Sequence, residues 1–287
     1  MHLARPSRAI VAAILLLTAA GCSAHRGHHP LTLATLYAQS SAESAANCRG
    51  VYAAARLQLD AALADTSWTA ALEQEGDFAA KPPAIVLDVD ETVLDNSPYE
   101  VRLIEDRIAY PAGWEAWCNQ AAAEPVAGAL AGGARGALEL TRYAAERGVT
   151  VFYLTNREAR LEAGTRRNLV AEGFPVAEDR DVVLMANERE EWTSDKTTRR
   201  RAIAETHRIV MLFGDNMGDF VARDDARGTP AERAAVMKQH ADRWGTRWFM
   251  LPNAMYGYWD GAVLGYDYDR SESVVDGLRL DGLDARR

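Results

Sequence analysis

The stretch that decides the fold is IVLDVDET, residues 85–92, in which a short apolar run stops abruptly at two aspartates. Lys81-Pro82-Pro83 precedes it and interrupts any helix that approaches from the N-terminal side. An apolar run of this length is typical of a strand that is buried on both faces, as in a parallel sheet. We therefore predict a buried strand over residues 84–87, which ends where Asp88 and Asp90 begin.

The rest of the chain repeats this pattern. Further apolar runs lie at residues 149–154, 182–185, 209–213 and 248–251, the last being the weakest. Helical stretches lie between or beside them at residues 134–147, 157–172, 196–206 and 230–243, and two Ala-rich helices are expected within residues 31–72. Strands that alternate with helices predict an α/β fold, with a doubly wound, mainly parallel sheet and right-handed crossovers.

The pattern also predicts how the chain is divided. Residues 97–133 contain Trp114 and Trp117 but no strand pattern, which indicates an inserted cap. Residues after about 270 are polar and acidic, so we expect them to be loosely ordered. The predicted segments are a signal peptide (1–21), a tether (22–32), N-terminal helices (33–80), an α/β core (81–96 and 134–265), the cap insertion (97–133) and a C-terminal tail (266–287).

The amino-acid composition excludes some classes of function. The chain has 287 residues, of which 48% are hydrophobic and 25% charged, as in globular proteins. It carries 32 basic and 41 acidic residues and no long basic run, which argues against a nucleic acid polymer as partner. Lysine occurs only at positions 81, 196 and 238, so each lysine is a candidate for a specific role.

The N-terminus has the order of a signal peptide. Arg5 and Arg8 precede an apolar run that leads through small residues to Cys22. The small residues before Cys22 resemble the lipobox of bacterial lipoproteins, in which that cysteine is acylated, although Ala19 stands where Leu is commoner. An ordinary secretory peptide is the alternative. Export would place Cys48 and Cys118 where a disulfide can form, but the sequence fits one bridge or two thiols equally well.

Polar residues stand where the predicted strands end. Asp88 and Asp90 follow the first strand, and Asp215 and Asp219 follow the fourth. Ligand sites in open α/β sheets form beyond these carboxyl ends, so the four carboxylates are expected to converge. Their mutual repulsion requires a cation, and an all-oxygen set without His or Cys suits Mg²⁺.

Two further strand-end positions can hold a phosphate. Thr155, in the sequence Thr155-Asn156-Arg157, and Lys196 offer a hydroxyl and a compact cation to phosphoryl oxygens. The alternative for Lys196 is a solvated charge at the start of a helix. The two aspartates alone are weak evidence, because surface turns also contain that pattern. The ordered set is much more specific.

Two stretches of the sequence carry a family resemblance. Residues 86–99, VLDVDETVLDNSPY, and residues 210–220, VMLFGDNMGDF, resemble the paired signature of the class C acid phosphatases. These are bacterial lipoprotein phosphatases of the haloacid dehalogenase superfamily, with four signature aspartates. Val89 and Met217 are small departures that leave the chemistry unchanged. The resemblance runs from about Leu36 to Asp260 and implies that superfamily's core with a helical cap, to which the N-terminal helices contribute.

The resemblance implies a role for each matching residue. Asp88 matches the nucleophile, and Asp90 matches the acid/base, whose backbone carbonyl also binds magnesium. The metal set implied is Asp88, Asp90, Asp215 and Asp219, the last directly or through water. Thr155, Asn156 and Lys196 match the phosphate-binding positions, and Lys196 would also restrain the nucleophile. Asn216 matches an orienting neighbour.

The family's substrates include nucleoside monophosphates, whose bases rest between aromatic side chains. Tyr256 lies in a segment that resembles one such contact; Tyr99, Trp114 and Trp117 are further candidates, with structural packing the alternative for the tryptophans. The resemblance thus implies a magnesium-dependent phosphomonoesterase, nucleotidase-like, lipid-anchored in the bacterial cell envelope at the outer membrane.

Three other functions stay open at this stage. A phosphotransferase to an alcohol would share every site residue, and a non-catalytic surface lipoprotein could keep the same fold, although the nucleophile Asp88 is retained. Fold analogy also allows a dehalogenase or phosphonatase, but an acid at Asp90 suits an alkoxide leaving group better. A homodimer, the pH optimum and the physiological substrate are left open.

Overall fold

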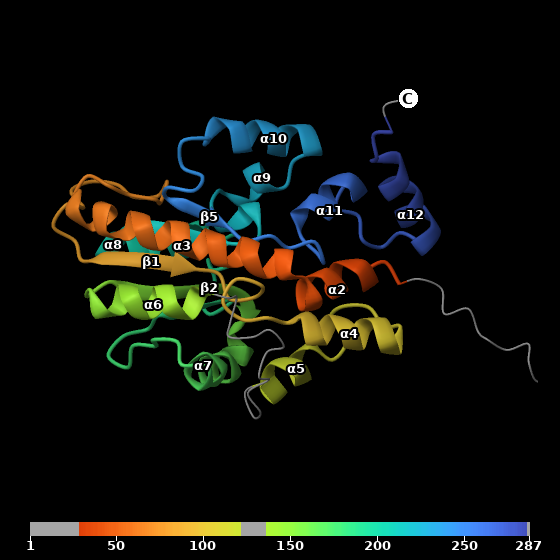
Figure 1. Ribbon diagram of the computed structural model, residues 1–287, viewed down its shortest axis with the longest axis horizontal. Coiled ribbons are helices and arrows are strands. Elements are labelled where there is room, and N and C mark those ends of the chain that lie inside the picture. Colours follow the sequence, from red (N-terminus) through yellow and green to blue (C-terminus); the bar gives the residue numbers. More distant parts are fainter. Residues whose placement is uncertain (1–28, 122–135, 286–287) are drawn as a thin grey trace, which may run out of the picture. The chain divides into compact units, whose positions relative to one another are not determined.

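The core of the protein is a five-stranded parallel sheet (Figure 1). This computed structural model describes residues 29–121 and 136–285. The strand order is β3-β2-β1-β4-β5, which places the predicted first strand in the centre. The strands are β1 (Pro83–Leu87), β2 (Thr150–Glu158), β3 (Val183–Ala186), β4 (Arg208–Gly214) and β5 (Trp248–Met250). The predicted doubly wound α/β fold is therefore confirmed.

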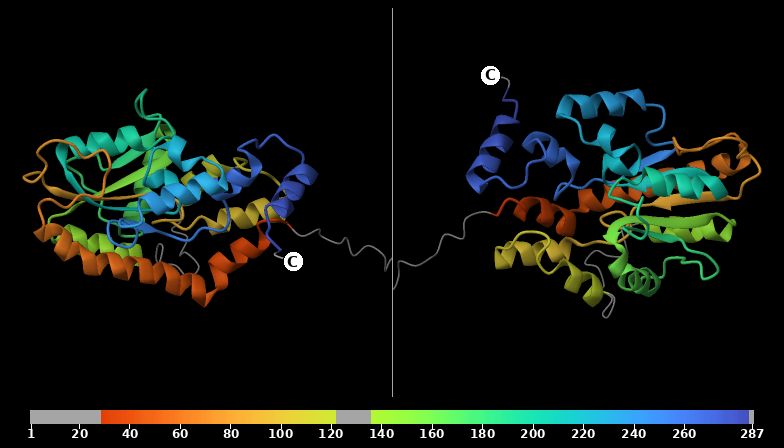
Figure 2. Two further views of the ribbon diagram at one scale, coloured as in Figure 1. Left: turned by 90° about the horizontal axis from the view of Figure 1, so that it is seen from above. Right: turned by 180° about the vertical axis from the view of Figure 1, so that it is seen from behind.

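Helices cover both faces of the sheet. They are α2 (Thr32–Ser40), α3 (Ala42–Ala64), α4 (Ser97–Asp106), α5 (Trp114–Ala121), α6 (Ala137–Glu146), α7 (Glu162–Ala171), α8 (Thr197–Thr206), α9 (Arg223–Ala226), α10 (Pro230–Gln239), α11 (Tyr258–Leu264) and α12 (Glu272–Asp281). Helices α3 and α6 contact each other on one face, and α8 lies on the other (Figure 2). Helix α6 connects β1 to β2 on one face, and α8 connects β3 to β4 on the other. Connections on both faces are expected for a doubly wound sheet.

The sheet is buried because its strands are apolar almost throughout. Every residue of β4 is buried, and in β1 only Pro83 is partly exposed. The two strands pair in parallel from Pro83 with Arg208 to Leu87 with Phe213, with one register shift after Ala84. The carboxyl ends of β1 and β4 therefore lie next to each other, which brings the residues that follow them to one edge of the sheet.

Two elements differ from the sequence prediction. Strand β2 runs on to Glu158, where it still pairs with Ala186, so residues 157–158 are strand and the helix α7 begins later. The C-terminal region, expected to be loosely ordered, forms α12, and Arg279 clamps it to Asp260 of α11 through two hydrogen bonds of 2.9 and 2.8 Å. The correction follows from Val274, Val275 and Leu278, whose helical spacing outweighs the polar composition of the segment.

The segment expected to be a cap contains α4 and α5, at the carboxyl ends of the strands (Figure 1). Helix α2 packs against α4, whereas α3 lies along the core beside α6 and β4. Residues 122–133 of the expected cap, the predicted signal peptide and Cys22 lie outside the described residues. No disulfide joins Cys48 and Cys118 in the part of the chain that the structure describes.

Candidate active site

Three aspartates meet at the carboxyl ends of β1 and β4. Asp88 follows β1, and Asp215 and Asp219 follow β4; one carboxylate oxygen of each lies within 4.8 Å of the others. Asp219 sits in the short 3-10 helix Met217–Asp219, and its Oδ2 accepts a hydrogen bond of 2.9 Å from the backbone N–H of Asn216. The predicted convergence of these three carboxylates is therefore present.

Close packing under Asp219 explains a glycine in this loop. A Cβ atom on Gly214 would lie 2.1 Å from Asp219 Oδ2 and 2.3 Å from its Cγ. No side chain can be accommodated at that separation unless the carboxylate moves. Gly214 thus allows the end of β4 and the fourth aspartate to approach each other.

Lys196 is the counter-charge of the cluster. Its Nζ donates to Asp88 Oδ1 and, at 2.6 Å, to Asp219 Oδ1, and the residue is only 4% exposed. The alternative of a solvated surface charge is therefore wrong. Burial opposes the charged form of this amine, but Asp219 and Asp88 outweigh burial, so the pKa of Lys196 lies above its usual value.

The cluster has more negative charge than Lys196 can neutralise. Burial is the main reason that the pKa of Asp88 is raised to about 7, with repulsion from Asp219 and Asp90 adding to it and Lys196 opposing it. Burial and then Asp88 and Asp219 raise the pKa of Asp215 well above its ordinary value. When all three carboxylates are ionised, they and the one ammonium carry two net negative charges, which is the charge that one divalent cation offsets. The donor set, all carboxylate oxygens, fits such an ion.

The side chain of Asp90 belongs to a different group of contacts. It is not part of the carboxylate cluster but forms a bidentate ion pair with Arg157, whose Nη2 lies 2.8 Å from Asp90 Oδ1. Asn96 also donates to Asp90 Oδ1, at 2.8 Å. The two signature aspartates after β1 are thus separated in role: Asp88 faces Lys196 and the cluster, and Asp90 faces Arg157.

Of the predicted phosphate-binding residues, two reach the site and one supports it. Thr155 is fully buried, and its hydroxyl lies 3.4 Å from Asp90 Oδ2. Lys196 lies against Asp88 as described. The side chain of Asn156 instead accepts a hydrogen bond of 2.6 Å from Arg199 and donates one of 3.1 Å to the carbonyl of Ser194. In this structure it fastens the end of β2 to α8 and the segment before it.

Of the aromatic residues predicted to contact a substrate, some are exposed and others are buried. Tyr256 is 39% exposed, so this residue is accessible to solvent. Tyr99 is buried and donates to the carbonyl of Ala112 at 3.0 Å, which leaves its ring no face open to a substrate in this structure. Trp114 packs edge-on against Tyr99, with ring centroids 5.0 Å apart, and lies 5.4 Å from the Arg157 guanidinium. Trp117 is buried, in line with the packing alternative.

Several residues that support the site were not predicted from the sequence. Arg199 is buried and donates to the carbonyl oxygen of Thr155, and buried Arg200 donates to the carbonyls of Gly218 and Asp219. Asn253 donates to Asp215 Oδ2 at 2.8 Å. The Lys-x-x-Arg-Arg spacing after β3 places these cations on one face of a helix and could have indicated the two arginines. The sequence alone, however, does not show that an arginine is buried.

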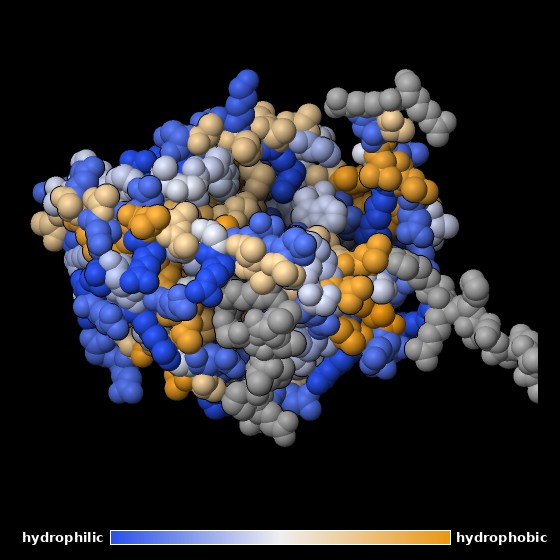
Figure 3. Space-filling view, viewed as in Figure 1, coloured by the Kyte–Doolittle hydropathy of each residue, from blue (hydrophilic) through white to orange (hydrophobic). Residues whose placement is uncertain are grey.

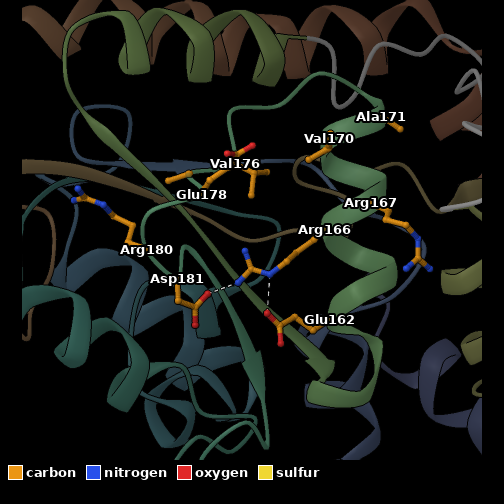
Figure 4. A pocket seen from close by; sticks show the side chains of 10 residues that line it. Glu162, Arg166, Arg167, Val170, Ala171, Val176, Glu178, Arg180 and Asp181 are labelled. Carbon is orange, nitrogen blue, oxygen red and sulfur yellow. Dashed lines mark hydrogen bonds and ion pairs between the residues drawn. The ribbon is translucent and has the colours of Figure 1, made fainter.

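A separate cavity lies away from these residues. It has a volume of about 900 Å³ and is lined by α7 and residues 176–181 (Figure 4). Arg166 is its central cation and is held between Glu162 and Asp181. None of the predicted site residues lines this cavity. We therefore do not assign it a part in the chemistry at the strand ends.

Comparison with known proteins agrees with this site. The family model of subfamily IIIB of the HAD superfamily (acid phosphatase) matches residues 17–259. The structure of the class C acid phosphatase from Bacillus anthracis is similar with 29% sequence identity and a TM-score of 0.75, covering 90% of this chain and 98% of that chain. A structure of that enzyme with tungstate bound gives 31% identity, with the same TM-score and coverage. This chain therefore belongs to the subfamily IIIB acid phosphatases of the HAD superfamily, and it is a phosphomonoesterase.

Proposed function

We propose that this enzyme is a magnesium-dependent phosphatase of nucleoside monophosphates and other small phosphate esters, which works through an aspartyl-phosphate at the cell envelope. The observation that carries the proposal is the meeting of Asp88, Asp215 and Asp219, of which Asp88 and Asp219 are paired with Lys196. A further support is that the similar Bacillus anthracis enzyme binds tungstate, a tetrahedral oxyanion like phosphate.

In the proposed reaction, an oxygen of Asp88 attacks the phosphorus, and the bond between phosphorus and the leaving oxygen breaks. Asp90 gives a proton to the leaving alkoxide and later takes one from the water that attacks the aspartyl-phosphate, which returns both side chains to their starting forms. Lys196 and Thr155 hold phosphoryl oxygens. Asp88, Asp215 and Asp219 would hold the divalent cation, which when bound offsets repulsion between the anionic nucleophile and the phosphate.

The metal requirement gives the direct test. A chelator should abolish hydrolysis of p-nitrophenyl phosphate, and Mg²⁺ should restore it. Asp215→Asn should raise the Mg²⁺ concentration for half-maximal activity by at least about tenfold, because loss of even an outer-shell partner costs about 10- to 100-fold. Asp260→Asn is the matched control, since Asp260 is paired with Arg279 outside the cluster. An unchanged Mg²⁺ activation curve for Asp215→Asn would refute the metal assignment.

Nucleotide preference is tested at Tyr256. Stacking on a base contributes about 1 to 3 kcal/mol in single-stranded nucleic acid binding, so Tyr256→Ala should raise KM for a nucleoside monophosphate about 5- to 150-fold with little change in kcat. Glycerol phosphate, which has no base, should keep its KM. Tyr268→Ala, at another exposed tyrosine, is the control variant. An equal rise in KM for both substrates would show that Tyr256 supports the phosphate site instead.

The proposed lipid anchor is tested at Cys22. Cys22→Ser removes the attachment point of the acyl chains, so the protein should leave the membrane fraction for the soluble one. In the described part of the chain, no helix is both long and apolar enough to cross a membrane. Helix α2, which follows the predicted tether, exposes Leu33, Leu36 and Tyr37, and apolar residues gather at that end of the molecule (Figure 3). If Cys22→Ser stayed with the membranes, acylation would not be the anchor.

A further inference from the structure

The two oxygens of the Asp90 carboxylate have different surroundings. Oδ1 accepts three hydrogen bonds, from Arg157 Nη2 at 2.8 Å, Arg157 Nε at 3.0 Å and Asn96 Nδ2 at 2.8 Å. The contacts of Oδ2 are longer, at 3.3 Å from Arg157 Nε and 3.4 Å from Thr155 Oγ1. Oδ1 is therefore saturated with donors, whereas Oδ2 is held loosely on the side of the phosphate-binding threonine.

Arg157 and Asn96, the donors to Oδ1, are themselves held in place by further hydrogen bonds. Arg157 Nη1 donates to Thr165 Oγ1 of α7 at 3.2 Å. Asn96 Oδ1 accepts from Trp117 Nε1 of α5 at 3.0 Å and from Arg157 Nη2 at 3.3 Å, so its amide nitrogen must face Asp90. Arg157, Asn96 and Trp117 are each no more than 3% exposed. Because water is excluded, these hydrogen bonds hold one geometry more firmly than exposed ones would.

This arrangement has a consequence for proton transfer. A general acid must present its proton within hydrogen-bond reach of the leaving oxygen. A proton on Oδ1 would face the N–H groups of Arg157 and Asn96, which are donors and cannot accept it. Oδ2 has one N–H contact, the long one of 3.3 Å from Arg157 Nε, and its other neighbour is the hydroxyl of Thr155, which can also accept a hydrogen bond, so a proton is better accommodated there. The planar fork of an arginine also fixes the plane of the carboxylate it pairs with, which a point charge would not do.

We propose that Arg157 and Asn96 are positioning residues, which hold Oδ1 of Asp90 so that Oδ2 is the oxygen that carries the proton. Oδ2 gives its proton to the leaving oxygen as the bond from phosphorus to that oxygen breaks, and it takes a proton from water when water attacks the phosphoryl group on Asp88. Trp117 connects the expected cap to this step through Asn96. The inference rests on the proposed function, in which Asp90 is the acid/base.

The test uses substrates with different demands for protonation. An alkyl phosphate needs an acid for its leaving group, whereas p-nitrophenyl phosphate expels a stable anion. The parameter is kcat/KM, which covers only the steps up to release of the leaving group. Arg157→Gln should lower kcat/KM for the alkyl phosphate at least about tenfold more than for the aryl phosphate, because it removes part of the factor of about 10² to 10⁴ that a positioned acid contributes. Asn96→Ala should act in the same direction with a smaller ratio.

The matched control is Arg199→Gln. Arg199 is as buried as Arg157, but it contacts the carbonyls of Thr155 and Thr193 and the side chain of Asn156 and makes no hydrogen bond to Asp90 in the described structure. It should lower kcat/KM for both substrates by the same factor. Thermal unfolding of each variant reports on folding, and Asn96→Ala keeps the test available if Arg157→Gln does not fold.

Two results would overturn the inference. Equal losses on both substrates in Arg157→Gln and Asn96→Ala, with unfolding temperatures near that of the wild type, would show that the network supports only the fold. Retained turnover by Asp88→Asn in the same assays would contradict the proposed function itself, and the inference with it. A selective loss on the alkyl phosphate, absent from Arg199→Gln, would confirm it.

Discussion

Asp88→Asn is expected to abolish turnover. The substitution is nearly isosteric but removes the anionic oxygen that attacks phosphorus, while the neighbouring carboxylate Asp219 stays bound by Lys196 and Asn216. Loss of a nucleophile in a hydrolase costs on the order of 10⁶ in kcat, so we expect a loss of at least about 10⁴-fold for both aryl and alkyl phosphates. Initial rates at saturating substrate and Mg²⁺ measure it.

Two controls separate this effect from misfolding. Lys196 keeps Asp219 as a partner in the variant, so the unfolding temperature should change little. Asp95→Asn alters a nearby carboxylate that accepts a backbone hydrogen bond from Ser97, and it should retain most of the activity. Activity of Asp88→Asn within tenfold of the wild type would remove Asp88 from the mechanism.

Asp90→Asn is the second substitution with a large expected effect. An amide cannot protonate an alkoxide, so kcat/KM for an alkyl phosphate should fall by about 10²- to 10⁴-fold. The fall for p-nitrophenyl phosphate should be much smaller, because its leaving group needs little protonation. The comparison of the two substrates on one variant is the measurement. Equal losses on both substrates would contradict the assignment of Asp90 as the acid that protonates the leaving group.

The same variant predicts a change of rate-limiting step. Asp90 is also the base that activates water, so its loss should slow hydrolysis of the aspartyl-phosphate after an aryl phosphate has reacted. A burst of p-nitrophenolate followed by slow turnover is expected. A linear time course without a burst, at enzyme concentrations high enough to see one, would argue against a role for Asp90 in the second step.

The sequence predicted the chemistry at the strand ends well, for a physical reason. A buried parallel strand needs an unbroken apolar run, and the polar residue that ends the run must lie at the sheet edge, so Asp88 and Asp215 could be located without coordinates. Thr155, the first polar residue after its apolar run, followed by the same logic, whereas Lys196, which lies beyond β3, was found through the scarcity of lysine in the chain. The fold class and the strand positions came from this one signal.

What the sequence could not show is which polar residues pair with each other. Arg157 was visible beside Thr155, yet its bidentate bond to Asp90 spans 67 positions and depends on how β1 and β2 pair. Tyr99 stands in the signature region, but only its burial shows that it is no open platform for a substrate. Helix α12 was missed because a polar composition hid a helical spacing. Partnership and burial are properties of the assembled fold rather than of local sequence.

The central claim is the aspartyl-phosphate on Asp88, and trapping that intermediate tests it most directly. Asp90→Asn enzyme is mixed with p-nitrophenyl phosphate and Mg²⁺, quenched in acid during the burst and digested at low pH, where acyl phosphates survive. Peptide mass spectrometry should find one added phosphoryl group on the peptide that contains Asp88, and none when Asp88 is also replaced by Asn. A burst without any phosphorylated peptide, or a phosphoryl group on another residue, would contradict the account.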